Sequence, residues 1–119
     1  MTNAQQVFIY KITTARLWVD AQQLGVLPPS PIDRTDGYMH FSTRDQLLET
    51  LALHFKGQSE LVLLRVPTAG LGDALVWEPS RGDQLFPHLY AALFLSVIDG
   101  HITVSVAHDG SCEIPRFFL

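Results

Sequence analysis

The segment ELVLLRVP, residues 60–67, places the strongest limits on how this chain folds. It is an almost uninterrupted apolar run, which predicts a strand buried on both faces in the middle of a sheet. Other elements must therefore cover both faces of that sheet. The chain has 119 residues, the length of one domain, and is long enough to bury about two-thirds of its unfolded surface. We therefore predict a single domain over residues 1–119, of the α+β class.

Two helices are predicted in the N-terminal half of the chain. The first runs through ARLWVDAQQL after a cap at Thr13 or Thr14, and Gly25 ends it. The second runs through RDQLLETLALHF, where Thr43 and Gln46 have the spacing of a capping box. The proline-rich stretch VLPPSPIDRTDG between them is predicted to be loop, because proline removes a backbone donor and disfavours helix in the residue before it.

The remaining strands are predicted from alternating or β-branched runs at residues 7–12, 37–42 and 74–78. Two later runs, LFLSVI and HITVSVA, are separated by Asp99 and Gly100, which favours a hairpin turn between them. The stretch PSRGDQLFPHLYAA has no clear period and is predicted to be loop. The tail EIPRFFL is predicted to add a short edge strand, so the second half of the domain is mostly β.

Charge and cysteine content narrow the range of functions. The formal net charge is −4 and charged residues make up 17% of the chain, so we expect neither nucleic acid nor a membrane as a partner. No apolar run approaches the roughly 20 residues that a membrane span needs. A single cysteine, Cys112, excludes an internal disulfide and favours a cytoplasmic location. The five histidines lack the spacing of metal ligands, so no metal site is predicted.

Polar and apolar side chains alternate in the segment DGYMHFST. On a strand, this pattern places Tyr38, His40 and Ser42 on one face. Met39 and Phe41 then lie on the other face. The polar face is either the solvated side of an antiparallel sheet or a ligand-binding surface. The second alternative is chemically sound because a neutral imidazole carries one donor and one acceptor, which suits a ribose hydroxyl or an amide.

A second candidate lies in the segment WEPSRGDQLFPHLY. Glu78 lies where a predicted strand gives way to loop, and Arg81 offers a planar guanidinium suited to phosphate or carboxylate. His88 and Tyr90 follow Pro87, which stiffens the segment. Binding residues often collect in long aperiodic segments of this kind. The composition is equally typical of a packed loop whose polar side chains bond to nearby backbone.

Taken in order, VFIYKIT, Trp18, DGYMHFST, LVLLRV, WEPSRG and LFPHLY resemble a bacterial and plant family known as domain of unknown function nine-five-two. The resemblance covers about residues 7–99. That family is similar in fold to the ADP-ribosyltransferase superfamily, whose curved, split and mostly antiparallel β-core binds NAD between two sheets. The resemblance therefore implies an ADP-ribosyltransferase-like fold with a ligand site between sheets.

The resemblance also implies roles for particular side chains. His40, His88 and Glu78 are the implied catalytic residues, and His40 with Ser42 would hold a ribose. Lys11 stands on the first strand where many family members have histidine, and an ammonium group only donates hydrogen bonds. The remaining ligand-binding candidates, for a nicotinamide ring and a pyrophosphate, are Tyr38, Tyr90 and Arg81.

Three functions are compatible with these expectations. In the first, the chain binds a small molecule, such as NAD or ADP-ribose, in a histidine-lined cleft. In the second, it is an ADP-ribosyltransferase-like enzyme that cleaves the nicotinamide glycosidic bond through an oxocarbenium-like state. In the third, it is a non-catalytic protein-interaction domain. No cofactor is required, although NAD could serve as a substrate. The first two functions require His40 and His88 to lie within about 10 Å of each other across one pocket.

Overall fold

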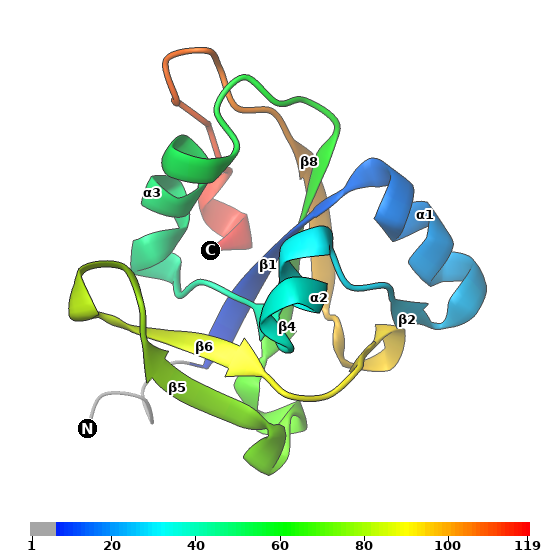
Figure 1. The fold of residues 1–119 in the computed structure, drawn as a ribbon. Coiled ribbons are helices and arrows are strands. Elements are labelled where there is room, and N and C mark those ends of the chain that lie inside the picture. Colours follow the sequence, from blue (N-terminus) through cyan, green and yellow to red (C-terminus); the bar gives the residue numbers. More distant parts are fainter. Residues whose placement is uncertain (1–6) are drawn as a thin grey trace.

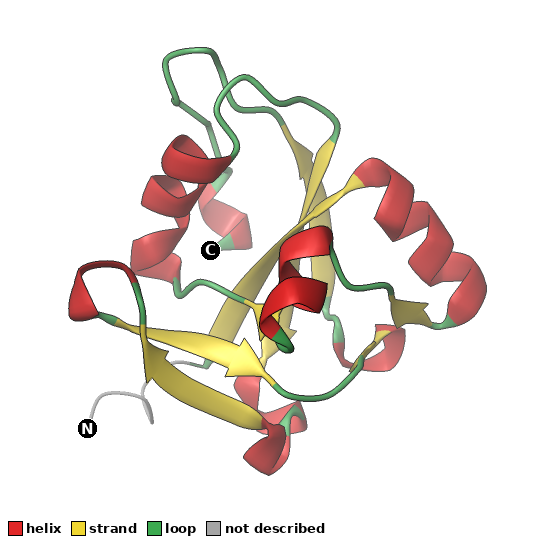
Figure 2. Cartoon of the chain, viewed as in Figure 1, coloured by secondary structure: helices red, strands yellow, loops and turns green. Residues whose placement is uncertain are grey.

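The described part of the chain, residues 7–119, forms three antiparallel sheets in a computed structural model (Figures 1 and 2). The central sheet has the order β1 (Phe8–Thr14), β4 (Leu61–Pro67) and β8 (Gly100–Val104). A second sheet has the order β3 (Met39–His40), β6 (Leu85–Leu89) and β5 (Leu75–Pro79). A short third sheet pairs β2 (Val26–Leu27) with β7 (Leu93–Phe94). The predicted α+β class and antiparallel pairing are confirmed.

The helices that pack around these sheets are α1 (Ala15–Leu24), α2 (Pro31–Asp36) and α3 (Arg44–His54). Figure 1 shows α1 and α3 on opposite sides of the view, with α2 between them near β6. None of the helices in residues 7–119 is long and apolar enough to cross a bilayer. The caps predicted at Thr14, Gly25 and the Thr43–Gln46 box are confirmed.

The prediction of only two helices is wrong, because α2 lies in the stretch predicted to be loop. Ser30 and Asp33 form a capping box at its start, and Pro31 occupies the first turn. Proline favours that position, since its φ is already helical and its missing N–H has no partner to lose there. The prediction treated the prolines only as helix breakers, and it therefore missed a helix that begins at one.

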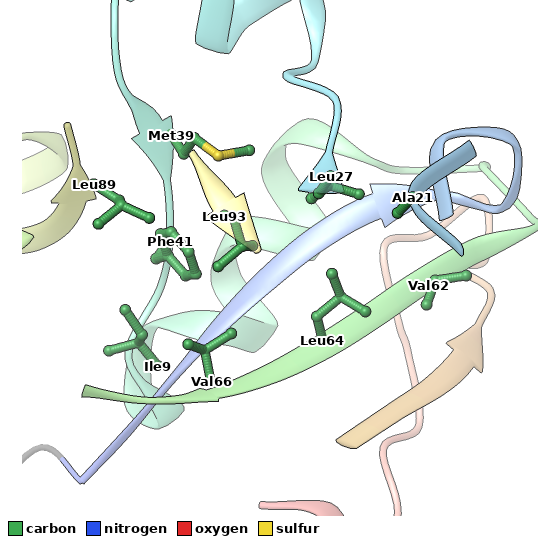
Figure 3. Close-up of a cluster of buried hydrophobic side chains, with 10 residues drawn as sticks. All are labelled: Ile9, Ala21, Leu27, Met39, Phe41, Val62, Leu64, Val66, Leu89 and Leu93. Atoms are coloured by element: carbon green, nitrogen blue, oxygen red, sulfur yellow. The ribbon is translucent and has the colours of Figure 1, made fainter. Parts of the chain in front are cut away.

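β4 is the buried central strand that its sequence predicts. Its side chains alternate between two hydrophobic clusters, one on each face of the central sheet. Val62, Leu64 and Val66 belong to the cluster in Figure 3, with partners from β1, β2, β6 and β7. Leu61 and Leu63 belong to the other cluster, which packs against α3 and the C-terminal turn. Both faces of the sheet are therefore covered, as the apolar run requires.

Residues 38–42, which we call the crossing segment, join the two larger sheets. Met39 and His40 pair with β6 of the second sheet. Two residues later, Ser42 exchanges two backbone hydrogen bonds of 2.9 Å with Tyr10 of β1 in the central sheet. The chain thus crosses from one sheet to the other within one short segment. This crossing holds His40 at the junction of the sheets, between β1 and β6.

Pro87 accounts for the short length of β3. A strand was predicted over 37–42, but β3 spans only Met39–His40. The Phe41 N–H donates to the Pro87 carbonyl at 3.1 Å. Proline has no N–H to complete the next pairing, so the ladder between β3 and β6 ends at this point. The free backbone after Phe41 then pairs with β1 instead.

Three predictions for the C-terminal half are wrong. The stretch 79–92, predicted to be loop, contains β6. Pro87 lies in the middle of this strand and interrupts the sequence pattern by which a strand is recognised. LFLSVI and HITVSVA do not form a hairpin, because β7 pairs with β2 and β8 pairs with β4. Asp99 instead bonds to Arg65 of β4, through its carboxylate at 2.8 Å and its N–H at 3.0 Å. The tail forms a 3₁₀ turn at Arg116–Phe118 rather than a strand.

Candidate functional site

A pocket with a volume of about 640 Å³ lies where the two larger sheets meet. Volumes of a few hundred cubic ångströms are typical of sites for small molecules. Its wall comes from β1, the starts of α1 and α2, the crossing segment, α3 and the turn between β5 and β6. The polar lining residues that matter most are Lys11, His40, Ser42, Thr50, Arg81 and His88.

His88 is a buried imidazole held in one orientation. Its Nδ1 lies 2.7 Å from Oε1 of Glu78, and the same oxygen accepts a 2.8 Å hydrogen bond from the Tyr90 hydroxyl. The ring of Tyr38 stacks on the imidazole with 4.1 Å between ring centroids. Glu78, Tyr90 and Tyr38 do not line the pocket themselves. These three side chains thus hold His88, which does line the pocket, from positions outside the wall.

The contact with Glu78 determines which nitrogen of His88 is available. The hydrogen bond from His88, and then that from Tyr90, lowers the pKa of Glu78, so its carboxylate is ionised and only accepts. The bond to Glu78 raises the pKa of Tyr90, so the phenol keeps its proton. A neutral His88 must then carry its proton on Nδ1. Its Nε2 presents a lone pair, and no hydrogen bond within residues 7–119 occupies that atom.

His40 contacts a carboxylate through each ring nitrogen. Its Nδ1 lies 2.7 Å from Asp33 and its Nε2 lies 2.8 Å from Asp36. Since carboxylates only accept, both contacts are hydrogen bonds when the ring carries two protons and a positive charge. The His40 and His88 ring centroids are 5.6 Å apart, and both side chains line the pocket. The geometry therefore meets the convergence that a shared site requires.

Asp33 organises this part of the site, and the sequence analysis missed it. It is buried at the start of α2 and accepts hydrogen bonds from Lys11 Nζ at 2.8 Å and from the backbone of Ser30 and His40 at 3.1 Å each. Lys11 also donates to the His40 carbonyl at 3.0 Å. The signal that could have found Asp33 is the Ser30-x-x-Asp33 spacing of a capping box.

Burial and ion pairing shift the pKa of Asp33 in opposite directions, and the same is true of the pKa of Lys11. Burial alone would raise the pKa of Asp33, but hydrogen bonding from His40 and the charge of Lys11 outweigh it and hold the pKa well below the usual range. Burial lowers the pKa of Lys11, and the charge of Asp33 opposes that shift. The two groups form a 2.8 Å ion pair in which Lys11 is the member that lines the pocket.

We expect this pair to make the protein sensitive to acid. The folded-state pKa of Asp33 is depressed, so its stabilisation is complete above the unfolded-state pKa of about 3.9. The stabilisation is lost as the pH falls below that value toward the folded-state pKa. Urea unfolding from about pH 6 to about pH 2 should show a falling free energy of unfolding, with a shallower fall in Asp33→Asn. Equal slopes in the two proteins would contradict this assignment.

Arg81 reaches the pocket from the turn between β5 and β6. Its Nη1 donates to the Thr50 hydroxyl at 3.3 Å, and Nη2 lies 3.1 Å from Glu49. The guanidinium lies over the ring of Phe86, with 4.8 Å between its central carbon and the ring centroid. Ser42 also donates to the Thr50 hydroxyl, at 3.1 Å. The predicted residues Arg81 and Ser42 are thus linked through α3.

The charged side chains that line the pocket are all basic. Its described wall contains a lysine, an arginine and three histidines, but no aspartate or glutamate. Four carboxylates that are not part of the lining each contact a basic lining residue: Asp33, Asp36, Glu49 and Glu78. The chain as a whole is acidic, with a formal net charge of −4. The wall is therefore largely apolar, and its charged side chains are basic although the protein as a whole is acidic.

The eight site residues predicted from the sequence fall into two groups. Five line the pocket: Lys11, His40, Ser42, Arg81 and His88. The other three, Tyr38, Glu78 and Tyr90, contact His88 or its partner outside the wall. Within residues 7–119, no group of three or more histidine, cysteine, aspartate or glutamate side chains is arranged to hold a metal ion.

Comparison with known proteins places the chain in a family. The model of the family described as "Protein of unknown function (DUF952)" matches residues 12–100. The crystal structure of protein CC0527 from Caulobacter crescentus is 40% identical, with a TM-score of 0.84, and the match covers 89% of this chain and 93% of that one. The solution structure of CC0527 is 41% identical, with a TM-score of 0.77 and coverage of 87% and 89%. No curated protein matches. The chain belongs to the DUF952 family, as its motifs predict.

Proposed function

We propose that this member of the DUF952 family binds a small phosphate-bearing molecule in the pocket between its two larger sheets, with ADP-ribose and NAD as the first candidates. The observation that carries the proposal is the one-sided charge of the pocket wall. Basic and imidazole side chains face the cavity, and every carboxylate that pairs with them lies behind. An anion gains from such a wall, because positively charged side chains line it and no carboxylate in the wall repels the ligand.

The parts of the wall match the parts of a nucleotide. Arg81 offers a planar guanidinium for phosphate, supported by Thr50 and by the ring of Phe86. The lone pair of His88 Nε2 accepts from a ribose hydroxyl. Apolar side chains complete the wall and suit the flat face of a base: Ile12, Leu17, Pro31, Ile32 and Phe55.

Lys11 contributes to this site mainly through its partners. Two of its three N–H groups are committed, to Asp33 and to the His40 carbonyl. The lysine therefore fixes α2 and the crossing segment against β1 and supplies one positive charge to the wall. This role differs from the ribose contact that a histidine at the same position would make.

Cleavage of the nicotinamide glycosidic bond has less support than binding. An oxocarbenium-like state develops positive charge, and a carboxylate facing the sugar would stabilise it. The candidate acid, Glu78, is instead held by His88 and Tyr90 outside the pocket wall. No contact favours the third alternative, a protein-interaction domain. We therefore infer an anion-binding site.

Calorimetry with ADP-ribose and with NAD tests the proposal. We expect binding of at least one nucleotide by the wild-type protein, weakening as salt is added. Arg81→Ala should weaken binding by about 10- to 100-fold, the equivalent of a charge-assisted hydrogen bond of about 1.5–3 kcal/mol. Arg116→Ala, an exposed arginine in the C-terminal turn, should bind like wild type. Absence of heat with both nucleotides, or an Arg81→Ala variant that binds normally, would refute it.

A further inference from the structure

We propose that the same pocket hydrolyses a small phosphodiester, with His88 as general base toward water and His40 as general acid toward the leaving oxygen. This inference rests on the proposed function, because it needs a phosphate group in the pocket. It adds an activity, a substrate class and opposite roles for two histidines.

His88 has the geometry of an oriented base. An ionised carboxylate holds Nδ1, the Tyr38 ring packs against the imidazole, and no hydrogen bond within residues 7–119 occupies Nε2 of this pocket-lining ring. A base that is fixed in this way transfers protons efficiently, because its orientation and tautomer do not have to be found during the reaction. Glu78 is a positioning residue here, since it acts through His88 and does not line the pocket.

The protein offers His88 no nucleophile of its own. No serine, threonine or cysteine within residues 7–119 forms a hydrogen bond with its imidazole. Two hydroxyls in the wall are engaged elsewhere, since Ser42 donates to Thr50 and Thr50 donates to the Gln46 carbonyl. A triad that forms a covalent intermediate needs a bond between nucleophile and base. His88 is therefore equipped to activate water directly.

His40 is equipped for the opposite task. Each of its ring nitrogens lies within hydrogen-bond distance of a carboxylate, and the ring that donates to both carries two protons and so has one to give. Asp33 is buried and keeps Nδ1 in place, whereas the Asp36 side chain is 34% exposed and can turn away into solvent. Its departure frees the Nε2–H for a substrate oxygen. Two neighbouring histidines with different partners thus divide into a base and an acid.

The two roles give a balanced reaction. Water attacks phosphorus while His88 Nε2 takes one of its protons. The bond from phosphorus to the leaving oxygen breaks with its electron pair, and that oxygen receives the proton from His40 Nε2. The products are a phosphomonoester and an alcohol. Afterwards His88 releases its proton to solvent and His40 takes one up, which restores the starting state.

The charges around the pocket favour phosphoryl chemistry. Negative charge shifts between the oxygens of the phosphate during attack, and Arg81, Lys11 and His40 face that charge with no carboxylate in the wall. A diester group carries one negative charge, so it opposes the approach of a nucleophile's lone pair less than the dianion of a monoester does. The ring centroids of His40 and His88, 5.6 Å apart, allow one phosphate group to contact both imidazoles.

The test uses the full chain with two probes, 2′,3′-cyclic AMP and bis(4-nitrophenyl) phosphate. We expect turnover by the wild type and a loss of about 10²–10⁴-fold in kcat for His88→Gln and for His40→Gln. His108→Gln, an exposed histidine outside the pocket, should behave like wild type. In ¹⁸O-water the phosphomonoester should gain one labelled oxygen, and intact mass should show no covalent adduct.

Calorimetry with ADP-ribose on every variant separates loss of folding or binding from loss of chemistry. A wild-type protein that binds ADP-ribose but hydrolyses neither probe would refute the activity and leave the binding proposal intact. No binding and no turnover would refute both. A covalent adduct, or full activity in His88→Gln, would also overturn the assignment of the base.

Discussion

Replacing Asp33 by asparagine is expected to lower the free energy of unfolding by about 3–5 kcal/mol. The Lys11 and Asp33 side chains are only 4% and 1% exposed, so the variant leaves a buried ammonium without its counter-charge. The substitution also weakens the contact to His40 Nδ1 and alters the start of α2, because the same carboxylate caps the helix. Urea unfolding monitored by circular dichroism measures the change, as a lower midpoint with an unchanged slope.

Two further variants separate the buried charge from the rest of the substitution. Asp36→Asn removes a carboxylate from the same imidazole, but its side chain is partly exposed, so a loss of no more than about 1 kcal/mol is expected. The double variant Lys11→Met with Asp33→Asn removes both charges and should recover much of the lost stability. Equal losses in the Asp33 and Asp36 variants would show that the buried ion pair does not hold the junction together.

The central sheet could be predicted from the sequence because each of its signals is local. The apolar run of β4 requires burial on both faces, and the two hydrophobic clusters on either side of it supply that burial. The caps at Thr14 and Thr43 depend on residues three positions apart, which fold in the same way in many proteins. Such features depend mainly on residues that are close in the sequence, so a sequence pattern is enough to identify them.

The pairing of the other strands could not be predicted, since it depends on contacts between distant residues. β6 lies between β3 and β5, but its internal Pro87 removes the pattern that identifies a central strand. The Asp99-Gly100 pair has the composition of a hairpin turn, yet its hydrogen bonds to Arg65 direct the chain onto β4. A local turn signal gives way when a long-range pairing buries more surface.

In the site, too, residues that lie in a sequence motif could be predicted, whereas their partners from distant segments could not. His40 and His88 stood out because each lies in a distinctive motif, and the crossing segment brings them together. Their carboxylate partners could not be assigned in the same way. Asp33 belongs to a helix that was predicted as loop, and its charge matters only because Lys11 of a distant strand lies opposite. Partners of this kind become visible only in three dimensions.

Replacing Phe41 by alanine is expected to lower the free energy of unfolding by about 3–5 kcal/mol, the range for deleting a buried aromatic ring. Phe41 is 3% exposed and packs in the cluster of Figure 3, at the point where the chain leaves the second sheet for β1. Lys11 Nζ also lies 5.8 Å from the centroid of its ring. Loss of the ring therefore opens the junction that supports both His40 and the ion pair.

Matched variants show whether the junction or the aromatic ring in general is responsible. Phe41→Leu keeps most of the apolar volume and should lose no more than about 1.5 kcal/mol. Phe94→Ala deletes a ring that is 56% exposed on β7, so its effect should be well below that of Phe41→Ala. Because Phe41 also lines the pocket, Phe41→Ala should weaken ADP-ribose binding, whereas Phe94→Ala should not. Equal stability losses in the two alanine variants would mean that the crossing segment contributes no more than an exposed edge.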